Sequence, residues 1–491
     1  MSEQLQPNGN PVRVGGITLR TPGLTGVATS HLPAGPATRS ASQGTGALES
    51  ALRNEGMRTT ETIEIGQTRE VPTAAARTRS TSFGEPAIEV EVPDPGEQWG
   101  QVILYTDEAG VTTWNFARDE ANRIDATRGR GTRTYVIRRR VNSAEAHPGT
   151  RGLVGMVGKK VLKVLAFPLL DPVVGEVSDF FAGLWEAKKR PYRVRLFTPD
   201  DYAAPNVAPL SDSDWQRLSR GRALMLVHGT FSRAHTAFGS LPREYVAALD
   251  RRYRGRVFAF DHFTLSEDPR QNVEWLTQQI PAGLSLDLDI ISHSRGGLVS
   301  RVLAERQAQL SLGDRRLRIR RIVFVATPNA GTVLANPGYI GDFIDAYTNI
   351  LNFFPDNGVT ETLEAIIAVV KQIAVAAAKG LDGLSSMRPE GPFLTELNQT
   401  PRVGTRYFAL ASNYEPSDTG LIAYAKDVLL DKIFAADNDL IVPTAGVWDH
   451  NGSGQFPIAQ RHIFAAGAGV AHSGFFGDAT ARERILGWLG A

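Results

Sequence analysis

The fold is decided by the stretch Asp287-Leu-Asp-Ile-Ile-Ser-His-Ser-Arg-Gly-Gly-Leu-Val299, which predicts a strand, a tight turn and a helix. The apolar first half predicts a buried strand that ends at Ile291, and a helix is predicted to begin at Arg295. A serine at the apex of such a turn has a strained backbone, and the residues two before and two after it must be small so that strand and helix can approach. Ser292 and Gly296 meet this requirement, so Ser294 is the predicted apex.

Strands and helices continue to alternate on both sides of this turn. Strands are predicted at 223–227, 256–260, 284–291, 319–326 and 406–410, and helices at 238–252, 269–279, 295–309 and 480–489. Apolar strands bounded by amphipathic helices predict a mostly parallel sheet that is covered on both faces. The predicted fold class is therefore α/β, with ligands expected beyond the carboxyl ends of the strands.

Two acidic residues and two histidines downstream are candidate partners of the serine. A serine hydroxyl is a poor nucleophile until an imidazole takes its proton, and a carboxylate must hold that imidazole in one tautomer. In strand-turn-helix triads the chain order is serine, then the acid, then histidine. The acid candidates are Asp437 and Asp439, and the base candidates are His462 and His472. The pattern favours Asp439, which directly precedes Leu-Ile-Val-Pro443, and His472, because His462 precedes an apolar run typical of a strand.

Five motifs, taken in order, resemble the α/β-hydrolase superfamily, and within it lipases and lipase-like esterases, over about residues 220–491. They are Val227-His-Gly-Thr-Phe231, similar to the oxyanion loop; Ser292-His-Ser-Arg-Gly-Gly297, similar to the nucleophile elbow but with serine in place of the first glycine; Ala326-Thr-Pro-Asn-Ala-Gly-Thr332, with Asn329 in place of a histidine; Asp439-Leu-Ile-Val-Pro443, with Leu440 in place of a glycine; and His472 before the last predicted helix.

The resemblance implies a role for each matching residue. Ser294 is the implied nucleophile, His472 the general base and then acid, and Asp439 the carboxylate that orients His472. The implied oxyanion donors are the backbone N–H of Arg295 and that of Thr230 or Phe231. Preorganised donors of this kind contribute on the order of 3 to 4 kcal/mol each. The resemblance implies neither a cofactor nor a metal.

Three further histidines are candidates for lining the substrate. His228 and His293 belong to the matching motifs, and His262 follows the predicted strand 256–260 toward the same end of the sheet. For His228 and His293 the sequence favours a structural role, hydrogen-bonded near the site. For His262 it favours a capping or surface position.

An insertion at about 336–399 interrupts the alternation. An apolar helical stripe is formed by Ile340, Phe343, Ile344, Tyr347, Ile350, Leu351, Phe353 and Phe354, and a second apolar helix is predicted within 363–378. Because the insertion follows the carboxyl end of a strand, we expect it to cover the nucleophile. It resembles the apolar lid of lipases, which moves to admit substrate. A fixed helical cap is the alternative, and either one favours apolar acyl substrates.

The first 195 residues lie outside the resemblance. Residues 1–90 are predicted to be a disordered tail, because the first 82 hold no aromatic residue and their apolar residues are scattered singly. Residues 97–195 are predicted to be a small accessory region with strands at 101–105, 111–116 and 134–137 and helices at 153–170 and 173–185. The Lys159, Lys160 and Lys163 side chains leave contact with a membrane surface open, although packing against the next domain is favoured.

Composition excludes several classes of site and partner. The 491 residues include 53 Lys and Arg and 52 Asp and Glu, so no overall positive field predicts a nucleic-acid partner. The absence of cysteine excludes disulfides, thiolate zinc sites and thiol nucleophiles, so a nucleophile must be an oxygen or a lysine. No apolar run of about 20 residues predicts a transmembrane helix, and no secretory signal is predicted, so a cytoplasmic location is expected.

Together these features predict a serine hydrolase that cleaves lipid or other apolar carboxylic esters through an acyl-enzyme. Two alternatives remain open. The first is an acyltransferase, thioesterase or amidase that uses the same triad. The second is a catalytically silent hydrolase fold that serves as a binding or scaffold protein. The expected partner is the apolar ester substrate.

Overall fold

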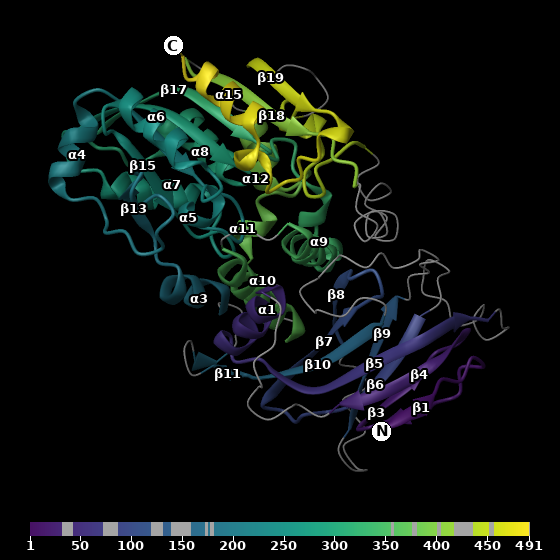
Figure 1. Cartoon of the computed structure of the whole chain (residues 1–491). Helices are drawn as coiled ribbons and strands as arrows, with labels where there is room; N and C mark the ends of the chain where they lie inside the picture. The colour runs from purple at the N-terminus through teal and green to yellow at the C-terminus, as the bar shows by residue number, and fades with distance from the viewer. Residues whose placement is uncertain are drawn as a thin grey trace.

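The computed structural model describes residues 1–31, 43–71, 87–118, 131–138, 159–171, 175–176, 181–354, 358–375, 381–399, 404–416, 436–450 and 456–490. Two regions built on β-sheets lie on either side of a helical layer (Figure 1). This layer contains α9 (Ile340–Phe353) and α10 (Val359–Ala374), together with α1 (Gln43–Asn54) and α3 (Phe181–Lys189).

The C-terminal region is organised around a sheet with the strand order β13-β15-β14-β16-β17-β18-β19. Its strands are β13 (Arg193–Leu196), β14 (Arg222–Val227), β15 (Val257–Asp261), β16 (Ser285–His293), β17 (Arg316–Val325), β18 (Arg406–Ser412) and β19 (Ile458–Phe464). The pairing of β13 with β15 is antiparallel, and the other pairings are parallel. The strands expected at 223–227, 256–260, 284–291, 319–326 and 406–410 are confirmed to within a few residues.

Helices cover both faces of this sheet, and its strands β14, β15 and β18 are accordingly buried along almost their whole length. One face packs against α4 (Asp212–Ser219), α7 (Pro269–Gln279) and α8 (Gly296–Glu305), and Met225 of β14 points toward them. The other face packs against α6 (Arg243–Tyr253) and α15 (Ala479–Trp488), toward which the next residue, Leu224, points. The short helix α5 (Ala234–Ala237) precedes α6. Among the described helices, none is both long and apolar enough to cross a membrane.

The insertion expected between β17 and β18 is helical. It comprises α9, α10, α11 (Asp382–Ser385) and α12 (Pro392–Asn398). Helix α10 is buried along most of its length because α9, α1 and α3 pack around it. The Lys371 ammonium donates to the Glu55 carbonyl at 3.1 Å, and Gln372 Oε1 accepts from the Ala182 N–H at 3.2 Å. The insertion is therefore attached to the N-terminal region as well as to the C-terminal sheet.

The N-terminal region is a pair of antiparallel sheets packed face to face. The first sheet has the order β1-β4-β5-β10-β7-β8 and the second the order β2-β3-β6-β9. The strands are β1 (Ser2–Gln4), β2 (Val12–Val14), β3 (Ile17–Arg20), β4 (Leu24–His31), β5 (Arg58–Glu70), β6 (Ala87–Pro93), β7 (Trp99–Thr106), β8 (Thr112–Asn115), β9 (Thr132–Arg138) and β10 (Lys160–Pro168). A two-stranded sheet of β11 (Leu170–Asp171) and β12 (Gly175–Glu176) follows. Both large sheets contribute side chains to one apolar core.

The prediction of a disordered tail at 1–90 is wrong for the residues that the structure describes. Residues 2–31 and 58–70 form strands whose single apolar residues alternate with polar ones, as Val12 and Val14 do in β2. Strands β2 to β5 each bury apolar side chains in a core to which residues 87–168 also contribute, whereas β1 is exposed. Residues 97–168 are therefore not a separate accessory region, because β7, β8, β9 and β10 complete the same two sheets.

The helix predicted at 153–170 is also wrong where it can be compared, because residues 160–168 form strand β10; residues 153–158 lie outside the described residues. Both faces of β10 are buried: Leu162 and Val164 face the core between the sheets, whereas Leu165 and Phe167 face the helical layer. This double burial removes the polar alternation that identifies a strand. The strands expected at 101–105, 111–116 and 134–137 correspond to β7, β8 and β9. The helix predicted at 173–185 is confirmed only from Phe181, where α3 begins; residues 175–176 form strand β12 instead, and residues 173–174 and 177–180 lie outside the described residues.

The three lysines considered for membrane contact have protein partners instead. Lys159 forms an ion pair with Glu64 at 3.0 Å, Lys160 pairs with Glu108, and Lys163 pairs with Glu49. Glu49 belongs to α1, so the Lys163 pair joins the sheet to the helical layer. These contacts favour packing within the protein over contact with a membrane.

Candidate active site

Ser294 lies at the turn between β16 and α8 in the strained conformation expected of an apex residue. Its φ angle is +51°, in the left-handed region that residues other than glycine rarely adopt. Ser292, which stands where glycine was expected, is buried and donates its hydroxyl to the Val323 carbonyl at 3.1 Å. The serine fits because this hydrogen bond satisfies its hydroxyl.

Gly296 is required by the close approach of two chain segments. A Cβ atom at this position would lie 2.4 Å from the carbonyl oxygens of both Val227 and His228. Gly229 follows Val227 and His228 in the loop after β14 and is also constrained, since a Cβ atom on Gly229 would lie 2.6 Å from the Cβ atom of Ser294. The loop after β14 therefore packs directly on the serine turn, where the oxyanion donors are expected.

We predict that Gly296→Ala lowers the free energy of unfolding by about 1 to 3 kcal/mol, because neither carbonyl belongs to a flexible side chain that could move aside. Denaturant unfolding monitored by circular dichroism measures this change. Gly487→Ala is the matched control, because a Cβ at this position in α15 meets nothing within 4 Å. The control is expected to raise the free energy of unfolding by about 0.5 to 1 kcal/mol. Equal stabilities for both variants would contradict the packing argument.

Asp439 and His472 contact each other deep in the protein. His472 Nδ1 lies 2.8 Å from Asp439 Oδ2, and both side chains are almost completely buried. The other carboxylate oxygen of Asp439 accepts the N–H groups of Ile441 at 3.0 Å and Val442 at 2.8 Å. Because a carboxylate accepts hydrogen bonds, Nδ1 of His472 is the donor in this contact, and in the neutral imidazole Nε2 is then the acceptor. The acid is therefore held by its own loop and orients the imidazole.

The alternative acid and base lie away from this contact. The Asp437 residue is exposed, whereas Asp439 is buried. His462 lies within β19, where its ring meets Phe464 at 4.7 Å. Leu440, which replaces the expected glycine, adopts a φ of +83°, so this loop keeps the conformation for which glycine is usual. The geometry thus brings Asp439 and His472 together, and not Asp437 or His462.

The sequence did not single out Tyr347, whose hydroxyl lies 3.3 Å from His472 Nε2. Burial raises the pKa of Tyr347, and the neighbouring Ser294 hydroxyl opposes that rise, so the phenol stays neutral. Ser294 Oγ is buried, and with the described residues it forms no hydrogen bond of good geometry. The Tyr347 hydroxyl is thus hydrogen-bonded to His472 Nε2, the nitrogen that would have to take the proton of a serine nucleophile. The only signal in the sequence was that Tyr347 carries the one hydroxyl on the apolar stripe of 340–354.

The loop of the predicted oxyanion donors lies beside Ser294. Thr230 and Phe231 are buried, and Phe231 has a φ of +60°. The Arg295 side chain is also buried; it donates to the Gly383 carbonyl at 2.8 Å and the Phe263 carbonyl at 3.3 Å. Burial lowers the pKa of Arg295 to about 10. Its guanidinium therefore ties the serine turn to the helical insertion, which leaves the Arg295 backbone N–H as the group expected to bind an oxyanion.

His228 and His262 stack on each other with ring centroids 4.3 Å apart. The His262 backbone N–H donates to His228 Nε2 at 3.1 Å, and His262 Nε2 lies 3.1 Å from the His228 carbonyl. Burial lowers the pKa of His228 to about 3, and it lowers the pKa of His262 well below the ordinary value. Both rings are therefore neutral, and they link the ends of β14 and β15.

His293 holds the loop that carries the candidate base. Its Nε2 lies 2.9 Å from the His472 carbonyl, and burial lowers its pKa to about 3. The contacts of His228, His262 and His293 are thus with protein groups, which favours a structural role for all three. The surface position favoured for His262 is wrong, because the residue is buried against His228. In the part of the chain that the structure describes, no group of three or more His, Asp or Glu side chains could hold a metal ion.

The C-terminal region matches the model of one known family. A model described as a domain of unknown function, DUF7379, matches residues 189–490, more than half of the chain. The chain belongs to the DUF7379 family. No curated protein matches the sequence.

Solved structures similar to this DUF7379 chain include three bacterial lipases. Mature lipase BlEst2 from Bacillus licheniformis is 17% identical, with 54% of this chain and 91% of that chain covered and a TM-score of 0.33. Lipase 1 from Pelosinus fermentans is 14% identical, with 54% and 97% covered and a TM-score of 0.34. Staphylococcus hyicus lipase is 13% identical, with 55% and 93% covered and a TM-score of 0.33.

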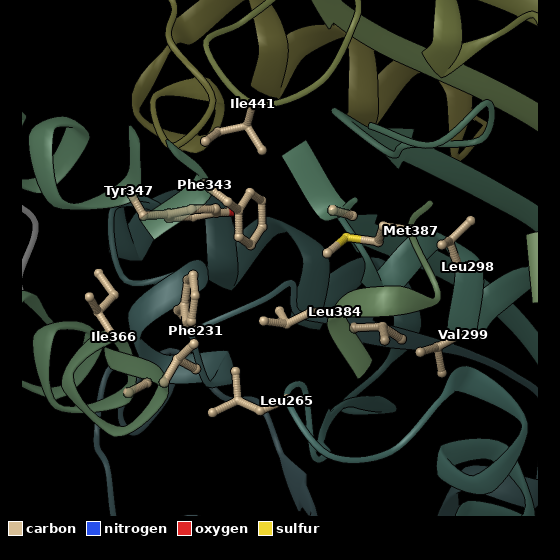
Figure 2. Close-up of a cluster of buried hydrophobic side chains, with 14 of the residues drawn as sticks. Phe231, Leu265, Leu298, Val299, Phe343, Tyr347, Ile366, Leu384, Met387 and Ile441 are labelled. Carbon is tan, nitrogen blue, oxygen red and sulfur yellow. The ribbon is translucent and has the colours of Figure 1, made fainter. Parts of the chain in front are cut away.

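Apolar side chains from the helical insertion and the strand-end loops fill the space around Tyr347 (Figure 2). The Phe231 ring lies 4.9 Å from the Tyr347 ring and 5.7 Å from the Phe343 ring. The side chains of Leu384 and Met387 come from the segment after α10 and belong to the same cluster. The insertion and the strand-end loops of this DUF7379 domain thus both contribute apolar groups around Tyr347.

Proposed function

We propose that this protein is a serine ester hydrolase with the α/β-hydrolase fold, and that its substrates are apolar carboxylic esters. The observation that carries the proposal is the buried Asp439–His472 contact next to a strained serine turn. A carboxylate that fixes the imidazole tautomer and a serine in a strained strand-to-helix turn are typical of nucleophilic acyl transfer in α/β-hydrolase folds. The apolar cluster around Tyr347 supports an acyl chain as the bound group.

In the proposed reaction Ser294 Oγ attacks the ester carbonyl while His472 Nε2 takes its proton. Asp439 keeps the imidazole in the required tautomer and stabilises the imidazolium that forms. The backbone N–H groups of Arg295 and of Thr230 or Phe231 stabilise the developing oxyanion. His472 then protonates the leaving alcohol, and water, activated by the same imidazole, releases the acid from the acyl-enzyme. An alcohol, thiol or amine acceptor in place of water, or a thioester or amide substrate, would use the same intermediate.

Labelling with a fluorophosphonate probe tests the proposal. We expect the folded wild-type chain to form a covalent adduct that peptide mass spectrometry locates on Ser294. The Ser294→Ala variant is expected to form none, whereas Ser292→Ala, two residues away, is expected to keep labelling. A series of p-nitrophenyl esters then measures chain-length preference, for which we expect higher kcat/KM with longer acyl chains. If the folded wild type stays unlabelled, and so does a folded Tyr347→Phe variant that frees His472 Nε2, the fold serves as a silent binding module.

A further inference from the structure

Helix α9 presents polar side chains along one face to the outer strand of the N-terminal sheet. Asp345, Asn349 and Asn352, which are four and three residues apart, lie on one helical face. Asp345 Oδ1 accepts the Trp114 N–H at 2.8 Å, and Asn352 Nδ2 donates to the Gly110 carbonyl at 2.7 Å. Between them, Asn349 makes two hydrogen bonds with the backbone of Thr112, at 2.8 Å to its N–H and 2.7 Å to its carbonyl. Figure 1 shows α9 beside β8.

These contacts fix the position of α9 relative to the β-strands. Strand β8 is the last in its sheet, so every second N–H and C=O group points away from β7 and lacks a strand partner. Asp345 and Asn349 of α9 form hydrogen bonds with these backbone groups, at Trp114 and Thr112 respectively. The Trp114 indole N–H adds a hydrogen bond to Thr348 Oγ1 at 3.1 Å. All of the paired groups are buried, so a shift of the helix would leave several of them unsatisfied.

The opposite face of α9 carries the groups that close the active site. Tyr347 places its hydroxyl on His472 Nε2 and its ring against Phe231. Because Nδ1 of His472 carries the hydrogen that faces Asp439, the Tyr347 hydroxyl donates to Nε2 and occupies the lone pair that would accept the serine proton. Ser294 is only 1% exposed in this arrangement. Substrate therefore cannot reach Ser294 unless the groups that cover it move, and Tyr347 of α9 is one of these groups.

We propose that the N-terminal β region is an inhibitory clamp. Through the backbone of β8 it holds α9 in place, and α9 in turn keeps Tyr347 on the base. Release of the β8–α9 contact frees His472 Nε2 and uncovers Ser294. This inference rests on the proposed function, because it concerns the regulation of the same site.

The rate of fluorophosphonate labelling of the full chain tests the clamp. Asn349→Ala removes two hydrogen bonds to β8 and leaves every residue of the proposed catalytic machinery unchanged. Since a net hydrogen bond contributes on the order of 1 kcal/mol, or about fivefold in an equilibrium, we expect the labelling rate constant to rise at least about tenfold. Hydrogen exchange of the α9 amides should accelerate in parallel. The control is Thr113→Ala, on the face of β8 away from α9, for which neither rate should change.

Two further variants keep the test decisive. Asn352→Ala loosens the same contact at its other end and serves if Asn349→Ala does not fold. Tyr347→Phe keeps the ring and the clamp but frees His472 Nε2, so labelling should accelerate without faster exchange in α9. Faster exchange in Asn349→Ala with an unchanged labelling rate would overturn the clamp, as would slower labelling of Tyr347→Phe. If neither the wild type nor any variant becomes labelled, the proposed function fails instead.

Discussion

Asp439→Asn is expected to lower kcat for ester hydrolysis by about 10⁴-fold while the protein remains folded. The asparagine carbonyl can replace Oδ1 as acceptor for the Ile441 and Val442 N–H groups, so the loop keeps its conformation. The amide NH₂ then takes the position of Oδ2, 2.8 Å from His472 Nδ1. Because this group only donates, Nδ1 must become the acceptor and Nε2 must carry the hydrogen. An imidazole in that tautomer cannot take the proton of Ser294.

Steady-state kinetics on one activated ester measure this loss, and the fluorophosphonate labelling rate should fall with kcat. Asp437→Asn removes the same charge two residues earlier on an exposed side chain, and we expect it to keep the wild-type kcat. Circular dichroism and the unfolding midpoint establish that Asp439→Asn is folded. If Asp439→Asn keeps more than a tenth of the wild-type kcat, Asp439 does not set the tautomer of His472.

The serine turn and its sheet could be predicted because their determinants are local. A buried strand, a turn of small residues and a helix lie within Asp287–Val299, and each neighbouring strand is a short apolar run. The joint order of Ser294, Asp439 and His472 supplied the rest of the candidate site. Where the sequence departs from the usual pattern, the structure shows how the departure is accommodated: Ser292 has a hydrogen-bond partner, and Leu440 adopts the left-handed conformation of the glycine it replaces.

The N-terminal sheets could not be predicted because their determinants are distant in sequence. Within the first 70 residues β2 pairs with β3 and β4 pairs with β1 and β5, but Ile63 in β5 pairs with Leu162 in β10, and the core also needs side chains of β6, β7, β9 and β10. The alternating strands of the first 70 residues therefore do not reveal a complete core by themselves. Strand β10 was mistaken for a helix because the sandwich core covers one of its faces and the helical layer covers the other. Tyr347 was missed for a related reason: a helical stripe shows that a side chain is buried but not that it reaches His472.

Glu55→Gln is expected to stabilise the protein above pH 7 and to leave its stability unchanged at pH 4.5 and below. Burial raises the pKa of Glu55 from 4.5 to about 7, even though Lys189, Lys371 and the Trp185 indole N–H act in the opposite direction. The carboxylate is 2% exposed, between the end of α1 and helices α3 and α10. Glu364, a like charge on α10, adds to the increase. The neutral acid is thus the form that the folded protein prefers.

The pH window follows from this pKa difference. Between pH 4.5 and 7 the folded chain keeps a proton on Glu55 that the unfolded chain has released, so the free energy of unfolding decreases as pH rises. Below pH 4.5 the group is protonated in both states, and above pH 7 it is ionised in both. At about 1.4 kcal/mol per pH unit, the stability lost across the window is about 3 kcal/mol. Glutamine keeps an acceptor for the Trp185 indole N–H and carries no charge, so it avoids this loss.

Urea unfolding of wild type and Glu55→Gln from pH 4 to 8.5 measures the difference directly. The buried histidines His228 and His293, with pKa values of about 3, make both chains less stable toward low pH, and this contribution cancels in the comparison. Glu3→Gln, at an exposed position of β1, controls for the loss of one charge. The difference between wild type and Glu55→Gln should grow from near zero at pH 4.5 to about 3 kcal/mol above pH 7. A constant difference across this range would mean that Glu55 does not titrate within the junction of α1, α3 and α10.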